Sequence, residues 1–229
     1  MVNYQIAIDG PAGSGKSTVA KQIAKKLGFL YVDTGAMYRA VTLKTIREKI
    51  SFQNQCPIIN LAKNTEITFL IDEKVGQRVF LDGEDVTVAI RMPDVTNAVS
   101  FVSRITGVRV ALVKHQQALA TNNNVVMEGR DIGSVVLPNA FLKIYLTASI
   151  EERARRRFEE NKTKGINTDM ETLRAEIAER DLIDSTRKES PLIKVADAVE
   201  IETDSLTACQ VAEKIIDIFN ERVENGKQD

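Results

Sequence analysis

The stretch Ile6–Thr18 reads I-A-I-D-G-P-A-G-S-G-K-S-T. Its apolar start predicts a buried strand that ends at Asp9, and a helical pattern follows the glycines and runs to about Leu27. Between them lies the pattern G-x-x-x-x-G-K-[ST], with the strand before it and the helix after it that a phosphate-binding P-loop requires. Backbone N–H groups of such a loop and the N-terminus of the following helix hold phosphate oxygens. The stretch therefore predicts a nucleoside triphosphate site.

Each part of this loop has an expected task. The ammonium of Lys16 is expected to reach the β- and γ-phosphates, and the hydroxyl of Ser17 is expected to be a ligand of Mg²⁺. The alternative is a glycine-rich turn that only resembles a P-loop, but the flanking strand and helix argue against it. The residues predicted to bind the triphosphate are Gly10, Pro11, Ala12, Gly13, Ser14, Gly15, Lys16, Ser17 and Thr18.

Composition limits the partners. The chain has 31 basic and 32 acidic residues and a formal net charge of -1, which disfavours a nucleic acid polymer or an anionic membrane. The sequence contains neither a signal-peptide pattern nor an apolar stretch of membrane-spanning length, so we expect a cytoplasmic protein. Cys56 and Cys209 stand far apart and indicate neither a zinc site nor a redox motif. We expect a monomer.

The order of the elements predicts an α/β fold. Five short apolar runs alternate with longer helical stretches, which favours a five-stranded parallel sheet flanked by helices. Ligands of such sheets bind at the carboxyl ends of the strands, and each run here ends in polar residues. The runs are Tyr4–Asp9, Phe29–Asp33, Asn124–Glu128, Leu142–Thr147 and Ala198–Thr203.

One segment, about residues 65–90, breaks this alternation. It shows three β-type runs with turn signals between them, which predict a small antiparallel sheet inserted into the α/β core. Two helical patterns follow, roughly Pro93–Arg104 and Val108–Thr121. The three runs are Ile67–Ile71, Arg78–Leu81 and Asp85–Val88, and the turn signals are Val75-Gly76 and Asp82-Gly83.

A second segment, Ile150–Lys188, is almost wholly helical and rich in arginine. It lies where a mobile lid is expected, between the fourth and fifth strands. Arg153, Arg156 and Arg157 share one helix face at i, i+3 and i+4. Arg180, Asp184 and Arg187 share another at i, i+4 and i+7. The alternative for either face is a solvated stripe of charges.

Six motifs, in order along the chain, indicate which molecule accepts the phosphoryl group. The motifs are D-T-G-A-M-Y-R (Asp33–Arg39), N-A-V-S (Asn97–Ser100), G-V-R (Gly107–Arg109), E-G-R-D-I-G (Glu128–Gly133), E-E-R-A-R-R-R (Glu151–Arg157) and E-R-D-x-x-D-x-x-R (Glu179–Arg187). No N-K-x-D stretch is present to read guanine. Together the motifs resemble those of the bacterial cytidylate kinases, which are nucleoside monophosphate kinases, and the resemblance extends from Ile6 to Phe219.

The resemblance implies a single P-loop kinase domain over residues 1–229. In this domain an acceptor-binding lobe covers about residues 34–110, and a helical lid covers about residues 150–190. It also implies transfer of a phosphoryl group from Mg²⁺·ATP to CMP, with dCMP as a further acceptor, giving CDP or dCDP and ADP.

Carried over by position, the resemblance implies four sets of site residues besides the P-loop. Thr34 would belong to the acceptor lobe. The acceptor phosphate would be held by Arg39, Arg130 and Arg187, and the base by Ser100, Arg109 and Asp131. Arg180 and Asp184 would lie near the ribose, and Arg153 and Arg157 would close over the ATP phosphates. The residues expected to act on the transferring group are Lys16, Arg130, Arg153, Arg157 and Arg187.

Three alternatives stay open at this stage. Asp131 could anchor Arg130 or help to order Mg²⁺ instead of reading the base. The chain could be a P-loop kinase for an alcohol such as shikimate, which would need a base near the hydroxyl. It could also be a nucleotide-gated binding protein that hydrolyses ATP slowly and releases no product diphosphate.

Overall fold

The structure is a computed structural model that describes residues 3–72, 76–163 and 165–226. The chain divides into two compact units. The first, here called the P-loop unit, comprises Met1–Tyr31 and Asn122–Asp229; the second, the middle unit, comprises Val32–Thr121. The lobe expected over residues 34–110 falls within the middle unit, and the expected lid falls within the P-loop unit.

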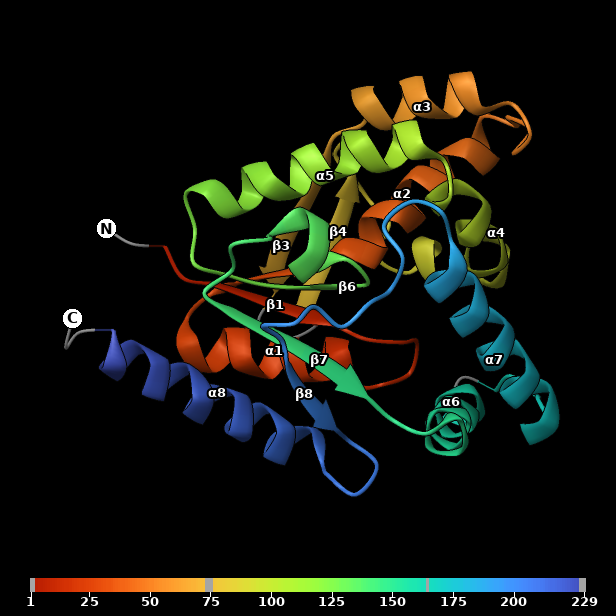
Figure 1. The fold of residues 1–229 in the computed structure, drawn as a ribbon. Coiled ribbons are helices and arrows are strands. Elements are labelled where there is room, and N and C mark those ends of the chain that lie inside the picture. The colour runs from red at the N-terminus through yellow and green to blue at the C-terminus, as the bar shows by residue number, and fades with distance from the viewer. Residues whose placement is uncertain (1–2, 73–75, 164, 227–229) are drawn as a thin grey trace. The chain divides into compact units, whose positions relative to one another are not determined.

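A five-stranded sheet carries the P-loop (Figure 1). Its strand order is β2-β6-β1-β7-β8, so β1 is central and pairs in parallel with β6 on one side and β7 on the other. The five predicted strands and the parallel sheet are confirmed. The bounds are Gln5–Asp9 (β1), Leu30–Asp33 (β2), Val125–Gly129 (β6), Leu142–Thr147 (β7) and Val199–Glu202 (β8).

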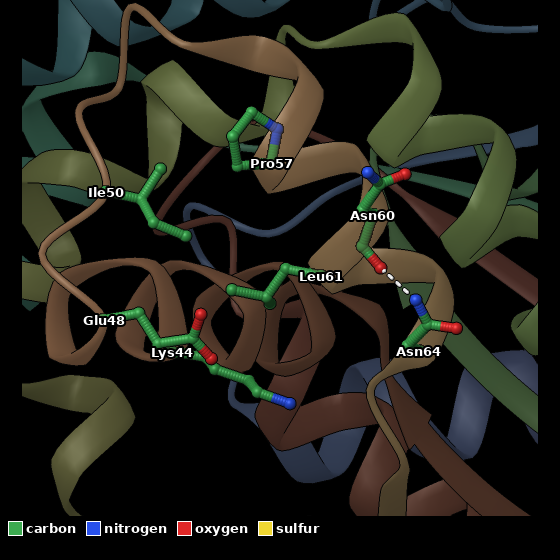
Figure 2. Close-up of a pocket in the computed structure, with 7 residues that line it drawn as sticks. All are labelled: Lys44, Glu48, Ile50, Pro57, Asn60, Leu61 and Asn64. Carbon is green, nitrogen blue, oxygen red and sulfur yellow. Dashed lines mark hydrogen bonds between the residues drawn. The ribbon is translucent and has the colours of Figure 1, made fainter.

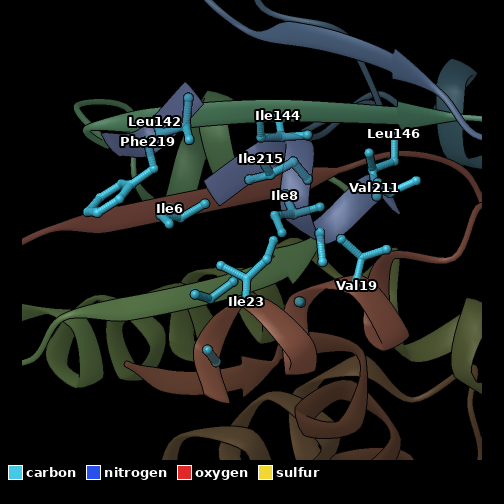
Figure 3. Close-up of a cluster of buried hydrophobic side chains, with 14 of the residues drawn as sticks. Ile6, Ile8, Val19, Ile23, Leu142, Ile144, Leu146, Val211, Ile215 and Phe219 are labelled. Atoms are coloured by element: carbon cyan, nitrogen blue, oxygen red, sulfur yellow. The ribbon is translucent and has the colours of Figure 1, made fainter. Parts of the chain in front are cut away.

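The hydrophobic core of the P-loop unit lies between this sheet and two helices, α1 (Lys16–Leu27) and α8 (Ala208–Asn225) (Figure 3). Ile6 and Ile8 of β1 are fully buried there. Each buried side chain of this size contributes roughly 1.5–3 kcal/mol. A capping box formed by Thr207 starts α8. This packing gives the P-loop a rigid support.

The predicted helical lid segment consists of α6 (Ile150–Thr163) and α7 (Met170–Thr186). Ala154, Leu173 and Ile177 form a small apolar cluster between these two helices. A single π-helical turn, η2 (Ile132–Val136), lies between β6 and β7. Within the described ranges, no helix is both long enough and apolar enough to cross a membrane.

The middle unit combines helices with the predicted small antiparallel sheet, whose strand order is β3-β4-β5. The turn at Asp82-Gly83 has positive φ at both residues, as expected for a tight hairpin. The other turn signal, Val75-Gly76, falls partly outside the described residues. The elements are α2 (Thr34–Arg47), α3 (Gln55–Asn64), β3 (Ile67–Asp72), β4 (Gly76–Leu81), β5 (Glu84–Asp85), η1 (Ala89–Arg91), α4 (Pro93–Ser103) and α5 (Thr106–Thr121).

The third strand of the insert is shorter than predicted. The sequence predicts a strand over Asp85–Val88, but β5 ends at Asp85. Asp85 Oδ1 accepts hydrogen bonds from the backbone N–H of Thr87 at 2.9 Å and from its hydroxyl at 2.6 Å. The same hydroxyl accepts the N–H of Val79 at 2.9 Å, in place of a backbone carbonyl. These side-chain bonds compete with the strand ladder and turn the chain into η1.

Candidate active site

Gly10 gives the P-loop its sharp departure from β1. Its φ is +149°, and a Cβ at this position would lie 2.0 Å from the carbonyl oxygen of Leu146 in β7. Farther along, the Ser14 hydroxyl donates to the carbonyl oxygen of Pro11 at 3.0 Å and closes the loop. Gly15 precedes α1, and among the described residues no side chain caps that helix. The first N–H groups of α1 are therefore available for an anion.

Lys16 is 5% exposed and lies inside the loop. Its Nζ donates to the carbonyl oxygen of Pro11 at 2.6 Å and lies 3.3 Å from the Ser14 hydroxyl. Burial, followed by the charge of Arg130, lowers the pKa of this ammonium to about 7. A triphosphate would add negative charge beside Lys16, and its phosphate oxygens would stabilise the charged lysine.

The hydroxyl of Ser17 is exposed at the first turn of α1. Among the described residues, no group of three or more His, Cys, Asp and Glu side chains is placed to hold a metal ion. Mg²⁺ that accompanies a nucleotide takes most of its ligands from phosphates and water, with few from protein. An exposed hydroxyl beside the loop fits that requirement.

The P-loop unit also gathers a charged cluster, here called the arginine cluster. Arg130 Nε donates to Asp184 Oδ2 at 2.9 Å. Arg187 lies 3.9 Å from Asp184 and 3.9 Å from Asp131. Burial raises the pKa of Asp184, but Arg130, Arg180 and Arg187 outweigh burial and hold it below its ordinary value. The cluster consists of Arg130, Asp131, Arg180, Asp184 and Arg187, all predicted from the sequence.

Arg187 reaches this cluster by a different route from the one predicted. The spacing predicted that it shares a helix face with Arg180 and Asp184, but α7 ends at Thr186 and Arg187 has an extended backbone. The hydroxyl of Thr186 donates to the carbonyl of Leu182 at 2.6 Å, an interaction that slightly destabilises helices and often bends them. Arg187 Nε donates to the carbonyl of Ser190 at 2.6 Å. The turn after the helix therefore places this guanidinium.

The two predicted lid arginines have different surroundings. Arg153 is 4% exposed; its Nε donates to the carbonyl of Ala148 at 3.0 Å and its NH1 to that of Ala12 in the P-loop at 3.2 Å. Its NH2 lies 2.6 Å from Asp181 Oδ2 on α7. Arg157 instead lies on the surface and pairs with Glu160 at 3.2 Å.

Arg156, which the sequence placed on the same helix face but not in the site, also reaches the edge of the P-loop. Its NH2 donates to the carbonyl of Thr203 at 2.7 Å and its NH1 to the Thr203 hydroxyl at 3.0 Å. Its NH1 lies 3.6 Å from the position that a Cβ on Gly15 would occupy. The sequence signal for a role of Arg156 was its spacing, which puts it on one helix face with Arg153 and Arg157.

The middle unit positions its own predicted residues on α2, α4 and α5. Thr34 is the buried first residue of α2, and Ser100 is partly buried on α4. Arg39 NH1 donates to the hydroxyl of Thr96 at 3.1 Å. The Arg109 guanidinium lies 5.5 Å from the ring centroid of Tyr38, and its NH1 donates to the carbonyl of Ser103 at 3.2 Å.

Two buried carboxylates at strand ends were assigned no role from the sequence. Asp9 ends β1 and Glu128 lies near the end of β6; they are 6% and 5% exposed. The hydroxyl of Tyr31 donates to Glu128 Oε1 at 2.8 Å. The charges of both carboxylates raise the pKa of Lys16, against the larger effect of burial. The sequence signal for Asp9 was its position at the end of an apolar run, and Glu128 also begins the motif E-G-R-D-I-G.

A pocket of about 440 Å³ lies in the middle unit between α2 and α3, and Figure 2 shows its lining. Ile50, Pro57 and Leu61 form its apolar part. Asn64 Nδ2 donates to the carbonyl oxygen of Asn60 at 2.8 Å on one side of it. None of the residues that the sequence predicts for the site lines this pocket.

The fold and the site define a P-loop phosphotransferase, since a phosphate-binding loop with a buried lysine shares one unit with an arginine cluster. A solved shikimate kinase structure from Bacteroides thetaiotaomicron has a TM-score of 0.50 at 12% identity, with 95% of this chain and 98% of that chain covered. At this identity the likeness shows the fold alone.

Sequence comparison identifies the family. The family model for cytidylate kinase matches residues 6–221. A cytidylate kinase of Geobacillus sp. is 54% identical over 221 residues, which are 96% of this chain and 98% of the relative. One from Desulforamulus reducens is 56% identical over 211 residues, which are 92% and 94% of the two chains. The chain belongs to the cytidylate kinase family.

Proposed function

We propose that the P-loop, the arginine cluster and the arginines of the middle unit divide the work of one reaction. The reaction follows from family membership: the chain is an ATP-dependent nucleoside monophosphate kinase that converts ATP and CMP to ADP and CDP. One observation supports the division of work. The P-loop lysine and the arginine cluster lie side by side, as two phosphate groups would require. Asp9, the residue before the P-loop, accepts the N–H of Ile132 at 2.8 Å just after Arg130 and Asp131. The charges of Arg130 and Arg180 reach Lys16 and lower its pKa.

On the donor side, the loop Gly10–Thr18 and the N-terminus of α1 bind the triphosphate, and Lys16 moves from the Pro11 carbonyl to the β- and γ-phosphates. The Ser17 hydroxyl would be a ligand of Mg²⁺, which would neutralise part of the phosphate charge of ATP. Arg153 and Arg157, which both lie on α6, bind the phosphates of ATP. For Arg153 the support is its contact with the P-loop carbonyl of Ala12.

On the acceptor side, Arg130 and Arg187 hold the phosphate of CMP, together with Arg39 of the middle unit. An oxygen of that phosphate attacks the γ-phosphorus, the new O–P bond forms, and the bond to the β,γ-bridging oxygen breaks to release ADP. This oxygen is already anionic near neutral pH, so the reaction needs no general base. The arginines lower the barrier by neutralising two anionic reactants.

The base is read by Asp131, Arg109 and Ser100, and the ribose by Arg180 and Asp184, with Thr34 in the same acceptor lobe. Cytosine presents an exocyclic amine that donates, with N3 and O2 that accept. A carboxylate suits the amine, and a guanidinium, which only donates, suits N3 and O2. Uracil reverses two of these groups. The set therefore favours CMP over UMP, and dCMP, which carries the same base, is a further acceptor.

A coupled assay with ATP and each of CMP, dCMP, UMP, AMP, GMP and shikimate tests the function. Formation of CDP from CMP and of dCDP from dCMP, at rates far above those with UMP, AMP, GMP and shikimate, is the expected result. Phosphorylation of shikimate in place of CMP would contradict it, as would ATP hydrolysis without a diphosphate product. A monomeric state and a cytoplasmic location stay predictions; the elution volume from a calibrated size-exclusion column tests the first.

Lysine in place of Arg39, Arg130 or Arg187 should raise the KM for CMP and lower kcat while leaving ATP affinity nearly unchanged. A guanidinium binds a phosphate through two parallel N–H groups, whereas an ammonium acts as a point charge. Initial rates at varied CMP, with ATP affinity from calorimetric titration, measure the two effects separately. An equal fall in ATP affinity would move these arginines to the donor side.

Asp131→Asn should narrow the preference for CMP over UMP as well as slow the enzyme. An amide both donates and accepts, so it tolerates the O4 of uracil, whereas a carboxylate opposite O4 leaves a buried charge unpaired at about 1–3 kcal/mol or more. The ratio of kcat/KM for the two nucleotides gives the measurement. A slower enzyme with an unchanged ratio would assign Asp131 to holding Arg187, which lies 3.9 Å away.

A further inference from the structure

Asp9 is a buried carboxylate to which the proposed division of work gives no task. It ends β1, and each of its two oxygens accepts one backbone N–H group. Oδ1 accepts the N–H of Ile132 at 2.8 Å, and Oδ2 accepts the N–H of Gly133 at 2.7 Å. These two residues directly follow Arg130 and Asp131 in the chain.

The strand ladder fixes the same short segment from its other side. In the parallel pairing of β1 with β6, Asp9 lies opposite Gly129, the residue before Arg130. Arg130 and Asp131 therefore lie between two points of the backbone that β1 holds: the ladder at Gly129 and the carboxylate bonds at Ile132.

The space around the carboxylate is closely filled. A Cβ added to Gly133 would lie 3.3 Å from Asp9 Oδ2 and 3.2 Å from the Cδ of Lys143 on β7. Both distances are shorter than ordinary van der Waals contact. Because glycine has no Cβ, its backbone N–H can approach the carboxylate at this position, and a larger residue would crowd the contact.

The carboxylate is costly for the fold. The pKa of Asp9 is raised to about 6, because burial and the charge of Asp131 outweigh the two backbone N–H groups and Lys16, which lower it. A buried acid with a raised pKa reduces stability once it is ionised. A charged acceptor nevertheless makes stronger hydrogen bonds to backbone N–H groups than a neutral one does. The gain that offsets the cost of this buried carboxylate is a firmly fixed backbone at Ile132 and Gly133.

We infer that Asp9 is a positioning residue for the acceptor nucleotide: its carboxylate fixes the backbone that carries Arg130 and Asp131 next to the P-loop. The inference rests on the proposed assignment of Arg130 and Asp131 to CMP. Asp9 acts through these two residues and need not touch either substrate.

Asp9→Asn tests the inference with little change in size. Its amide oxygen can accept one N–H, but its NH₂ group then faces the other backbone N–H, so one of the two bonds is lost. The kcat/KM for CMP should fall by about 10–100-fold, since a displacement near 1 Å at a reacting group has costs of this order. ATP affinity, measured by calorimetric titration, should stay near that of the parent, because the P-loop backbone is unchanged and the phosphates of bound ATP keep Lys16 charged without Asp9.

Two further variants complete the experiment. Gly133→Ala should shift the kinetics in the same direction, because the new methyl group pushes against Oδ2 and loosens the same contact. Asp169→Asn is the matched control. Its carboxylate also accepts a backbone N–H, that of Thr172 at 2.9 Å, but it is exposed and starts α7. This control should keep the parent kcat/KM.

The outcomes separate the inference from the proposed function. If Arg130→Lys impairs CMP use while Asp9→Asn and Gly133→Ala do not, the inference about Asp9 is overturned and the site assignment stands. If Arg130→Lys has no effect either, the assignment of Arg130 is wrong and the inference falls with it. A loss of ATP affinity equal to the loss of CMP use would assign Asp9 to the P-loop. If Asp9→Asn does not fold, Gly133→Ala decides.

Discussion

Replacing Lys16 with alanine should lower kcat by about 10³–10⁵-fold, the scale of a charged contact made in the transition state of phosphoryl transfer. Lys16 Nζ donates to the Pro11 carbonyl at 2.6 Å, so its ammonium lies inside the loop that binds phosphate. Its charge is opposed by burial, and alanine relieves that cost. The fold should therefore survive the change while turnover is lost.

Lys21→Ala provides the control for Lys16→Ala. Lys21 is an exposed residue of the same helix, and its Nζ lies 5.7 Å from the centroid of the Tyr31 ring. This variant should turn over at the parent rate. Circular dichroism and a thermal melt establish that both proteins are folded. A folded Lys16→Ala enzyme within tenfold of the parent would contradict the role given to this lysine.

Gly10→Ala should destabilise the whole protein. Its Cβ would lie 2.0 Å from the carbonyl oxygen of Leu146, and its φ of +149° is one that residues with side chains rarely adopt. Backbone strain of this kind costs about 1–3 kcal/mol. Overpacking adds about 1–3 kcal/mol. For a chain of this length the melting temperature should fall by roughly 5–20 °C, because 1 kcal/mol corresponds to about 2–4 °C.

Gly28→Ala separates the two causes. Gly28 also has a positive φ, +69°, but a Cβ there would meet no atom of the described residues within 4 Å. The cost is then that of the left-handed conformation alone, about 1–2 kcal/mol. Differential scanning calorimetry compares the two variants. Equal melting temperatures would show that the contact with Leu146 adds nothing.

Most of the fold could be predicted because its signals are local. An apolar run followed by G-P-A-G-S-G-K-S gave β1, the loop and α1, and four further runs gave the other strands. The prediction of a strand over Asp85–Val88 was wrong beyond Asp85, because the side chain of Thr87 supplies a hydrogen-bond acceptor there. A pattern of apolar residues does not indicate such side-chain bonds. Similarly, the end of α7 at Thr186 depends on hydroxyls that bond back to the helix.

The candidate site was harder to predict because its contacts join distant parts of the chain. The resemblance gave Arg130, Asp184 and Arg187, and the structure brings them together within the P-loop unit. Spacing alone could not show that Arg187 arrives through a turn or that Arg156 faces Thr203. Asp9 was missed because a polar residue at the end of a strand carries no pattern of its own; its partners are more than 120 residues away.

The hydrogen bonds of Arg153 have a thermodynamic consequence for nucleotide binding. A free arginine side chain has about 2 kcal/mol of rotamer entropy to lose when it binds a ligand. Arg153 loses it on folding, since the carbonyls of Ala148 and Ala12 and the carboxylate of Asp181 already order its guanidinium. Arg157, exposed beside Glu160, would lose it only when ATP arrives. Of the two, only Arg153 would meet the triphosphate with that entropy already lost.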